Sequence, residues 1–256
     1  MVSVSSQVSY RRSEEAWSGY EAFLKNLVET RGVRTICDIG GGANPVLPME
    51  YIEQHSLDYT VLDISETELQ KAPANYHKIA VDIASTDFSI SGKTYDLVFS
   101  KMLAEHITNA PQFHANIRTM LSPGGVAAHF FPTLYAFPFV VNRIIPDSLS
   151  DGLLSLFAPR DRFQHAKFPA YYQWCRGPTR RQFQRLAGVG LAVVEYIGFF
   201  GHGGYYRRLP GIRQIHELAT RMLMKFPNPC LTSYAFLVVT PLPQSDSDVP
   251  RFRHPV

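Results

Sequence analysis

Hydrophobic positions along the first half of the chain follow two alternating patterns. Short apolar runs are separated by stretches in which apolar residues recur at every third or fourth position. The runs predict strands buried on both faces, and the longer spacing predicts amphipathic helices. Strand and helix in alternation predict a mostly parallel sheet covered by helices on both faces. We expect strands at residues 34–39, 58–62, 78–81, 95–99 and 125–131, and helices at residues 46–54, 65–71 and 110–121.

The flanking segments have their own patterns. Ser13, acidic residues after it and Gly32 at the end predict an N-terminal helix. From residue 132 to 178 the alternation stops and aromatic residues and prolines crowd the chain, which we interpret as an inserted, mostly helical cap. Regular elements are then expected at residues 179–187 (helix), 191–196 (strand), 212–224 (helix) and 233–240 (strand), with a glycine-rich loop through Gly204 between the second and third.

The predicted fold class is therefore α/β. We expect a Rossmann-like, doubly wound sheet of seven strands, mostly parallel with an antiparallel final strand, plus the inserted helical cap. The expected segments are 1–32 (helical), 33–131 (ligand-binding core), 132–178 (cap), 179–241 (rest of the core) and 242–256 (flexible tail).

Composition agrees with one globular domain that carries an insertion. The chain has 256 residues, of which 45% are hydrophobic and 18% charged. No secretory signal precedes Tyr10 and no apolar run is long enough to span a bilayer, so we expect a cytoplasmic protein. The three cysteines are far apart, which indicates neither a disulfide framework nor a structural zinc site.

Charge is distributed unevenly. Residues 1–128 hold 10 Lys and Arg against 15 Asp and Glu, whereas residues 129–256 hold 15 against 7. A basic half could attract an anionic substrate or a polyanion, but solvated basic faces are the commoner explanation.

The segment DIGGGAN at residues 38–44 is the most informative one, because it directly follows a predicted strand. Glycines there let bare backbone approach a nucleotide-like ligand, and Asp63 at the tip of the next strand can accept hydrogen bonds from ribose hydroxyls. The pattern predicts a cofactor site.

The same segment resembles the first motif of the class I S-adenosylmethionine-dependent methyltransferases, with Asn44 in place of the last glycine. Four more segments resemble motifs of that family, in the family's order, and together they cover roughly residues 33–131. They are VLDI at 61–64, VDI at 81–83, YDLVFS at 95–100 followed by EHI at 105–107, and LSPGG at 121–125.

The resemblance implies an enzyme whose cofactor is S-adenosyl-L-methionine. It implies that the acid of the second motif binds the ribose hydroxyls and that the acid of the third lies by the adenine amino group. The cofactor-binding residues that we expect are Asp38, Gly40, Gly41, Gly42, Asn44, Asp63, Ile64, Asp82, Ile83, Ser100 and Lys101.

A nicotinamide-binding Rossmann domain shares the glycine turn and the acid on the second strand. Against it, Pro45 stands where the dinucleotide fingerprint needs a third small residue, and the chain has no Tyr-x-x-x-Lys. A methyl donor fits better.

Candidate catalytic residues are His106, shortly after the fourth strand, and His129, late in the fifth. A histidine titrates near neutral pH and suits a general base, but each could equally be a capping or core residue. Tyr171, Tyr172, His202 and Tyr205 are the candidate substrate-binding residues. No metal is expected, because no His-Glu-x-x-His or similar cluster occurs, and Asn/Asp-Pro-Pro-Tyr is also absent from the sequence.

The sequence thus predicts methylation of a small-molecule metabolite at oxygen or nitrogen by in-line transfer, with nucleic acid an unlikely partner. Two alternatives stay open: a nucleic-acid methyltransferase or binder that uses the basic half, and a catalytically silent S-adenosylmethionine-binding scaffold. The acceptor, the need for a base and the oligomeric state are not predicted.

Overall fold

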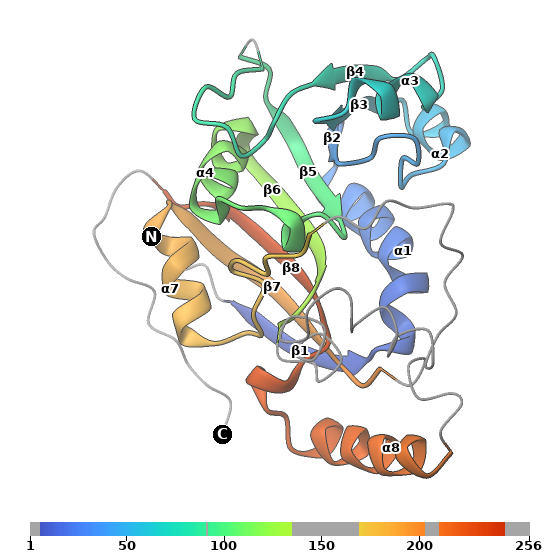
Figure 1. The fold of residues 1–256 in the computed structure, drawn as a ribbon. Helices are drawn as coiled ribbons and strands as arrows, with labels where there is room; N and C mark the ends of the chain where they lie inside the picture. The colour runs from blue at the N-terminus through green and yellow to red at the C-terminus, as the bar shows by residue number, and fades with distance from the viewer. Residues whose placement is uncertain (1–5, 91, 135–168, 203–209, 244–256) are drawn as a thin grey trace.

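The computed structural model describes residues 6–90, 92–134, 169–202 and 210–243, and these form one sheet flanked by helices (Figure 1). The sheet has eight strands in the order β1-β7-β8-β6-β5-β2-β3-β4. The strands are β1 (Gln7–Arg12), β2 (Thr35–Ile39), β3 (Asp58–Asp63), β4 (His77–Ala80), β5 (Tyr95–Lys101), β6 (Leu121–Pro132), β7 (Leu191–Phe200) and β8 (Tyr234–Pro241).

Strand directions confirm the predicted fold class. Only β8 runs antiparallel to its neighbours β6 and β7, and every other pairing is parallel. The predicted number of strands was wrong, because the sheet has eight strands and not seven. The additional strand is β1, which lies at the edge of the sheet along β7.

Helices lie on both sides of this sheet. In Figure 1 α1 lies to the right of the central strands, and α4 and α7 lie to the left. The helical elements are α1 (Glu14–Arg31), α2 (Met49–Gln54), α3 (Glu66–Lys71), α4 (Ala110–Met120), α7 (Arg180–Gly188) and α8 (Pro210–Lys225), with short 3-10 turns η1 (Ala104–His106) and η3 (Pro229–Leu231).

Capping residues explain several helix boundaries. The side chains of Ser65, Asn109 and Thr179 each accept a hydrogen bond from a backbone N–H of the first helical turn. Gly32 ends α1 in a left-handed conformation with φ of 63°. Ser13 behaves differently from the prediction, because its side chain makes no capping bond and its N–H instead donates to Phe200 O at the end of β7.

The core forms where α1 covers the middle of the sheet. Tyr20 of α1 is fully buried, and its ring contacts those of Phe130 and Phe236. Its hydroxyl lies 2.9 Å from the carbonyl oxygens of both Ser100 and Ala128. A single helix residue therefore joins β5 and β6 close to their carboxyl ends.

Three predicted boundaries differ from the observed ones by three or four residues. The second helix begins at Met49 rather than at residue 46, because Pro48 occupies the N-cap. The strand expected at 191–196 continues to Phe200 and so includes Gly198, where a Cβ atom would lie 2.7 Å from Thr232 Cγ2 and 3.0 Å from the Tyr10 ring. The strand expected at 125–131 begins four residues earlier, at Leu121.

Parts of two predictions lie outside the described residues. These are most of the cap, residues 135–168, and nearly all of the tail, residues 244–256. Residues 203–209, in the predicted glycine-rich loop, also lie outside them.

Candidate cofactor and acceptor site

The glycine turn lies at the carboxyl end of β2, between two carboxylates. Gly40 and Gly42 have φ of 75° and 41°, which side chains rarely adopt. A Cβ atom on Gly41 would lie 2.8 Å from Asp38 Cγ, and one on Gly42 would lie 3.0 Å from Asp63 Oδ2. The glycines therefore let the main chain pass directly against both acidic side chains.

Asp38 stabilises this turn through hydrogen bonds. It is buried, and its Oδ2 accepts hydrogen bonds from Val46 N (3.0 Å) and from the Tyr59 hydroxyl (2.7 Å). Burial raises the pKa of Asp38 to about 6, against the lowering effect of these two bonds. Asn44 closes the turn through its N–H, which donates to Gly41 O at 2.7 Å, and its side chain is exposed.

The acids of the next two strands remain at the surface. Asp63, half-buried at the end of β3, accepts a hydrogen bond from Ser65 N at 2.9 Å. Ile64 beside it is 72% exposed, an unusual position for an isoleucine. Asp82 is exposed and binds Ala84 N, whereas the Ile83 side chain is buried. Only the backbone of Ile83 is left for a ligand.

Ser100 and His129 lie side by side on β5 and β6, inside the protein. Ser100 Oγ lies 2.8 Å from His129 Nδ1, and both residues are 0% exposed. Burial lowers the pKa of His129 to about 3, so the ring is neutral at physiological pH. Its burial argues against direct contact with an acceptor. Lys101, the next residue of β5, is exposed and lies 5.8 Å from the Trp17 ring centre.

The loop after β5 folds over the glycine turn. A Cβ atom on Gly40 would lie 3.1 Å from Leu103 Cδ1, so Leu103 covers that glycine. Met102, one residue earlier, has φ of 55°, a left-handed conformation that costs energy for a side chain of this size. Backbone strain of this kind is typical of functional loops.

Glu105 follows in η1 and is the most unusual carboxylate of this region. It is 3% exposed, and its Oε2 has no hydrogen-bond partner among the described residues. Burial raises its pKa to about 8. A neutral, buried carboxyl group two residues after Leu103, the residue that covers Gly40, is a candidate for ligand contact.

The end of the predicted cap returns to this loop. Tyr171 N and Tyr172 N both donate to Glu105 O, at 2.7 and 3.0 Å, and His106 Nδ1 lies 2.8 Å from Pro169 O. His106 Nε2 lies 3.7 Å from Glu105 Oε1. Because Nδ1 must carry the hydrogen to bind a carbonyl, Nε2 of the neutral ring is the nitrogen that accepts a proton. The Tyr171 side chain is exposed, and that of Tyr172 is buried.

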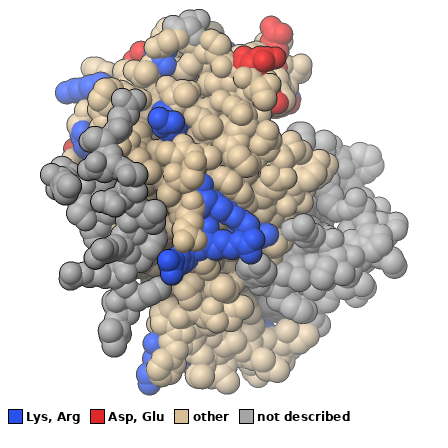
Figure 2. All heavy atoms as spheres, turned by 90° about the vertical axis from the view of Figure 1, so that its left-hand side faces the viewer, with Lys and Arg blue, Asp and Glu red and all other residues tan. Residues whose placement is uncertain are grey.

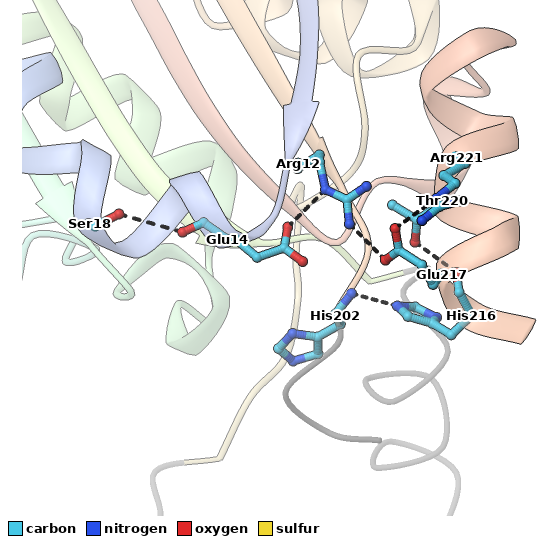
Figure 3. Close-up of polar contacts among 8 residues, drawn as sticks. All are labelled: Arg12, Glu14, Ser18, His202, His216, Glu217, Thr220 and Arg221. Atoms are coloured by element: carbon cyan, nitrogen blue, oxygen red, sulfur yellow. Dashed lines mark hydrogen bonds and ion pairs between the residues drawn. The ribbon is translucent and has the colours of Figure 1, made fainter. Parts of the chain in front are cut away.

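The structure places His202 away from the glycine turn. It follows β7, and β8, β6 and β5 lie between β7 and β2, a separation of about 19 Å at ordinary strand spacing. Figure 3 shows it beside His216 of α8, whose Nε2 accepts the His202 N–H at 2.7 Å. Tyr205 lies outside the described residues. Substrate contact at either position stays a prediction.

Basic side chains gather on the α7 side of the molecule, where Figure 2 shows Lys and Arg at the centre of the face and acidic residues at its upper edge.

Among the residues described, no three His, Cys, Asp or Glu side chains come together in a group that could hold a metal ion. None of the helices in the described ranges is long and apolar enough to cross a membrane.

Comparison with known proteins agrees with this geometry. Residues 37–129 match the model of a methyltransferase domain, a range that includes the glycine turn, Asp63, Asp82 and Glu105. No curated protein matches the sequence.

Solved structures with a similar fold cover most of the chain. An S-adenosylmethionine-dependent methyltransferase from Clostridium acetobutylicum has a TM-score of 0.54 at 11% identity, over 89% of this chain and 92% of that one. A putative sarcosine dimethylglycine methyltransferase from Galdieria sulphuraria has 0.52 at 12%, over 88% and 85%. A putative S-adenosylmethionine-dependent methyltransferase from Listeria monocytogenes has 0.51 at 14%, over 88% and 99%.

The fold and the matched domain define an S-adenosylmethionine-dependent methyltransferase. Residues 37–129 form the methyltransferase domain, and its cofactor is S-adenosyl-L-methionine. The residues of the glycine turn fit this cofactor. The turn exposes backbone without side chains, and Asp63 lies beside Gly42.

Sequence reasoning missed Glu105 as a candidate site residue. The sequence shows the pair Glu105-His106, but it indicates an acid-base role for the histidine alone. Nothing local indicates that the carboxyl group is buried, because segment 169–172, over sixty residues later, makes the contacts to η1.

Proposed function

We propose that this enzyme transfers the methyl group of S-adenosylmethionine to an oxygen or nitrogen atom of a small-molecule metabolite, by in-line displacement. The carrying observation is the double hydrogen bond from Tyr171 and Tyr172 to Glu105 O. It fixes the returning end of an aromatic-rich insertion beside the loop that covers the glycine turn. An acceptor that binds under this segment would lie next to the methyl donor.

The donor site in this proposal uses the carboxyl ends of β2, β3 and β5. The backbone of Gly40, Gly41 and Gly42 approaches the cofactor, and Asp63 accepts hydrogen bonds from its ribose hydroxyls. Ile64 offers an exposed apolar side chain to the adenine, with Asp82 and the Ile83 backbone at its edge. Asp38 and Asn44 hold the turn in shape, and Ser100 and Lys101 form the floor at β5.

The acceptor side uses Glu105, His106, Tyr171 and Tyr172. Methyl transfer requires mainly that the acceptor atom be aligned with the methyl group, and orientation of this kind supplies roughly 7–11 kcal/mol in well-oriented reactions. His106 is the candidate base for a hydroxyl acceptor, because its Nε2 can take a proton. Glu105, uncharged near neutral pH, would hold a polar group of the acceptor by a hydrogen bond.

The experiment is a transfer assay with S-adenosylmethionine labelled in its methyl group. The enzyme is incubated with a cell extract that has been separated into small molecules, nucleic acid and protein. We expect label in the small-molecule fraction, and less of it with His106→Ala or Glu105→Ala than with the parent enzyme. Label confined to nucleic acid or protein would refute the substrate class, and no label in any fraction would favour a silent scaffold.

A further inference from the structure

Helix α8 carries an apolar stripe that faces away from the body of the protein. Its members recur at intervals of three or four residues, so they lie on one side of the helix. They are Ile212 (48% exposed), Ile215 (72%), Leu218 (63%), Met222 (57%) and, directly after the helix, Phe226 (64%). So many large apolar side chains exposed on one helix indicate a contact surface.

The opposite side of α8 holds the helix on the sheet. Thr220 is buried, and its Cγ2 lies against Gly201, where an added Cβ would be 3.1 Å away. His216 accepts the His202 N–H, and Glu217 binds Arg12 Nη2 at 2.7 Å (Figure 3). Leu218 and Met222 are each two residues from Thr220, which is about 200° around the helix axis. The stripe therefore points outward while the helix stays fixed.

Charge around the stripe has one sign. Arg221 and Lys225 are exposed beside it, whereas Arg213 is exposed on the side of the helix that carries Thr220. The single acid of the helix, Glu217, is matched by Arg12 and by Arg221, whose Nε lies 3.1 Å away. Hydrogen bonds from these two arginines lower the pKa of Glu217, so it stays ionised and paired. The surface thus presents apolar side chains bordered by Arg221, which is paired with Glu217, and by Lys225, which has no acidic partner among the described residues.

This combination selects one kind of partner. A second copy of the chain would bring the same cations against each other, and the one acid of its α8, Glu217, is already paired with Arg12 and Arg221. An anionic phospholipid surface supplies both an apolar layer for the stripe and phosphate groups for the cations. We propose that α8 binds the protein peripherally to anionic membranes, with the stripe of residues 212, 215, 218, 222 and 226 inserted at the headgroup boundary.

Flotation of the full-length protein with lipid vesicles tests this proposal. We expect binding to vesicles of phosphatidylcholine mixed with phosphatidylglycerol, and little binding to phosphatidylcholine alone. Added salt should weaken binding by screening the cations. The triple variant Ile215→Ser, Leu218→Ser, Met222→Ser should reduce the partition coefficient at least about tenfold. Lys225→Gln should reduce it about fivefold.

Matched controls separate lipid binding from damage to the fold. Leu231→Ser removes an apolar side chain that is 45% exposed outside α8 and should leave binding unchanged. The triple variant should keep its affinity for S-adenosylhomocysteine, measured by calorimetry, which shows that the cofactor site is intact. The proposal is overturned if the parent protein does not float with anionic vesicles or if the triple variant floats equally well. A dimer that the triple variant dissociates, seen by analytical ultracentrifugation, would also overturn it.

Discussion

Ser100 Oγ and His129 Nδ1 form a 2.8 Å hydrogen bond between β5 and β6, with both side chains removed from solvent. The two residues are direct partners in the parallel register. The bond satisfies one ring nitrogen, while His129 Nε2 and the nearby His114 Nδ1 find no partner among the described residues. The histidine that the sequence suggested as a base is thus built into the sheet.

This burial predicts a sensitivity to acid. The pKa of His129 is lowered to about 3 in the folded protein, so below its ordinary value of 6.5 the unfolded chain takes up a proton that the folded chain refuses. Stability should therefore decrease as the pH falls from about 6.5 towards 3. At about pH 5 the loss from this residue is about 2 kcal/mol.

The variant His129→Gln removes that titration, so its free energy of unfolding should fall less between neutral pH and about pH 5 than that of the parent protein. Denaturant titrations at several pH values measure both slopes. Equal slopes would show that His129 does not hold its low pKa. His114, whose pKa burial also lowers well below normal, contributes in the same direction and remains in both proteins.

The raised pKa of Glu105 gives the opposite dependence of folding stability on pH. Its pKa is raised to about 8, so between about 4.5 and 8 the folded protein keeps a proton that the unfolded chain releases. Stability from this residue is complete below pH 4.5 and is lost as the pH rises. Glu105→Gln keeps the shape without the charge and should be more stable than the parent protein at about pH 8, by roughly 4 kcal/mol. If the variant is less stable at that pH, the carboxyl group is ionised in the fold.

Gly41 predicts a steric effect at the turn. In Gly41→Ala the new Cβ would lie 2.8 Å from Asp38 Cγ and 3.0 Å from Val61 Cγ1. Relief of this overlap should cost about 1–3 kcal/mol of stability and weaken S-adenosylhomocysteine binding. Gly19→Ala is the matched control, because a Cβ there meets no atom within 4 Å and Gly19 lies inside α1. That change should stabilise the protein by about 0.5–1 kcal/mol.

Asp63 predicts a loss of cofactor affinity. Asp63→Ala removes the carboxylate proposed to bind ribose, a charge-assisted hydrogen bond worth roughly 1.5–3 kcal/mol. Calorimetry with S-adenosylhomocysteine should show about 10- to 100-fold weaker binding. Asp87→Ala, an exposed acid outside the turn, serves as control and should bind as the parent does. Unchanged affinity in Asp63→Ala would place the ribose elsewhere.

The buried hydroxyl of Tyr20 should stabilise the packing of α1 on the sheet. Tyr20→Phe removes the hydroxyl that lies 2.9 Å from Ser100 O and Ala128 O and should cost about 1–2 kcal/mol in thermal or chemical unfolding. Tyr51→Phe removes a longer bond of 3.4 Å to Lys25 O at the surface and should cost less than about 0.5 kcal/mol. Similar losses of stability in both variants would mean that the buried hydroxyl contributes no more to stability than the one at the surface.

Local patterns were sufficient for most of the sheet. Strands such as β2 and β5 are mostly buried, so apolar residues predominate in their sequences. The strand β1 escaped prediction because it is a half-buried edge strand with two arginines at its end. Its partner β7 lies far along the chain, so nothing near residues 7–12 reports the pairing.

The candidate site was predictable only in its donor half. The glycine turn and Asp63 lie within one strand-helix-strand unit and are visible as motifs. Glu105 owes its importance to contacts with residues 169–172, and His202 owes its position to the order of strands in the sheet. Both depend on tertiary structure, which periodicity does not encode.

The place of β1 has a consequence for how the molecule is made. Ser6 Oγ donates to Val193 O at 2.8 Å, and Gln7 pairs with Glu195. On the ribosome, the first strand has no partner until nearly all of the remaining chain has been synthesised. One border of the sheet thus depends on contacts between residues 187 positions apart, and pairings of such high sequence separation form slowly.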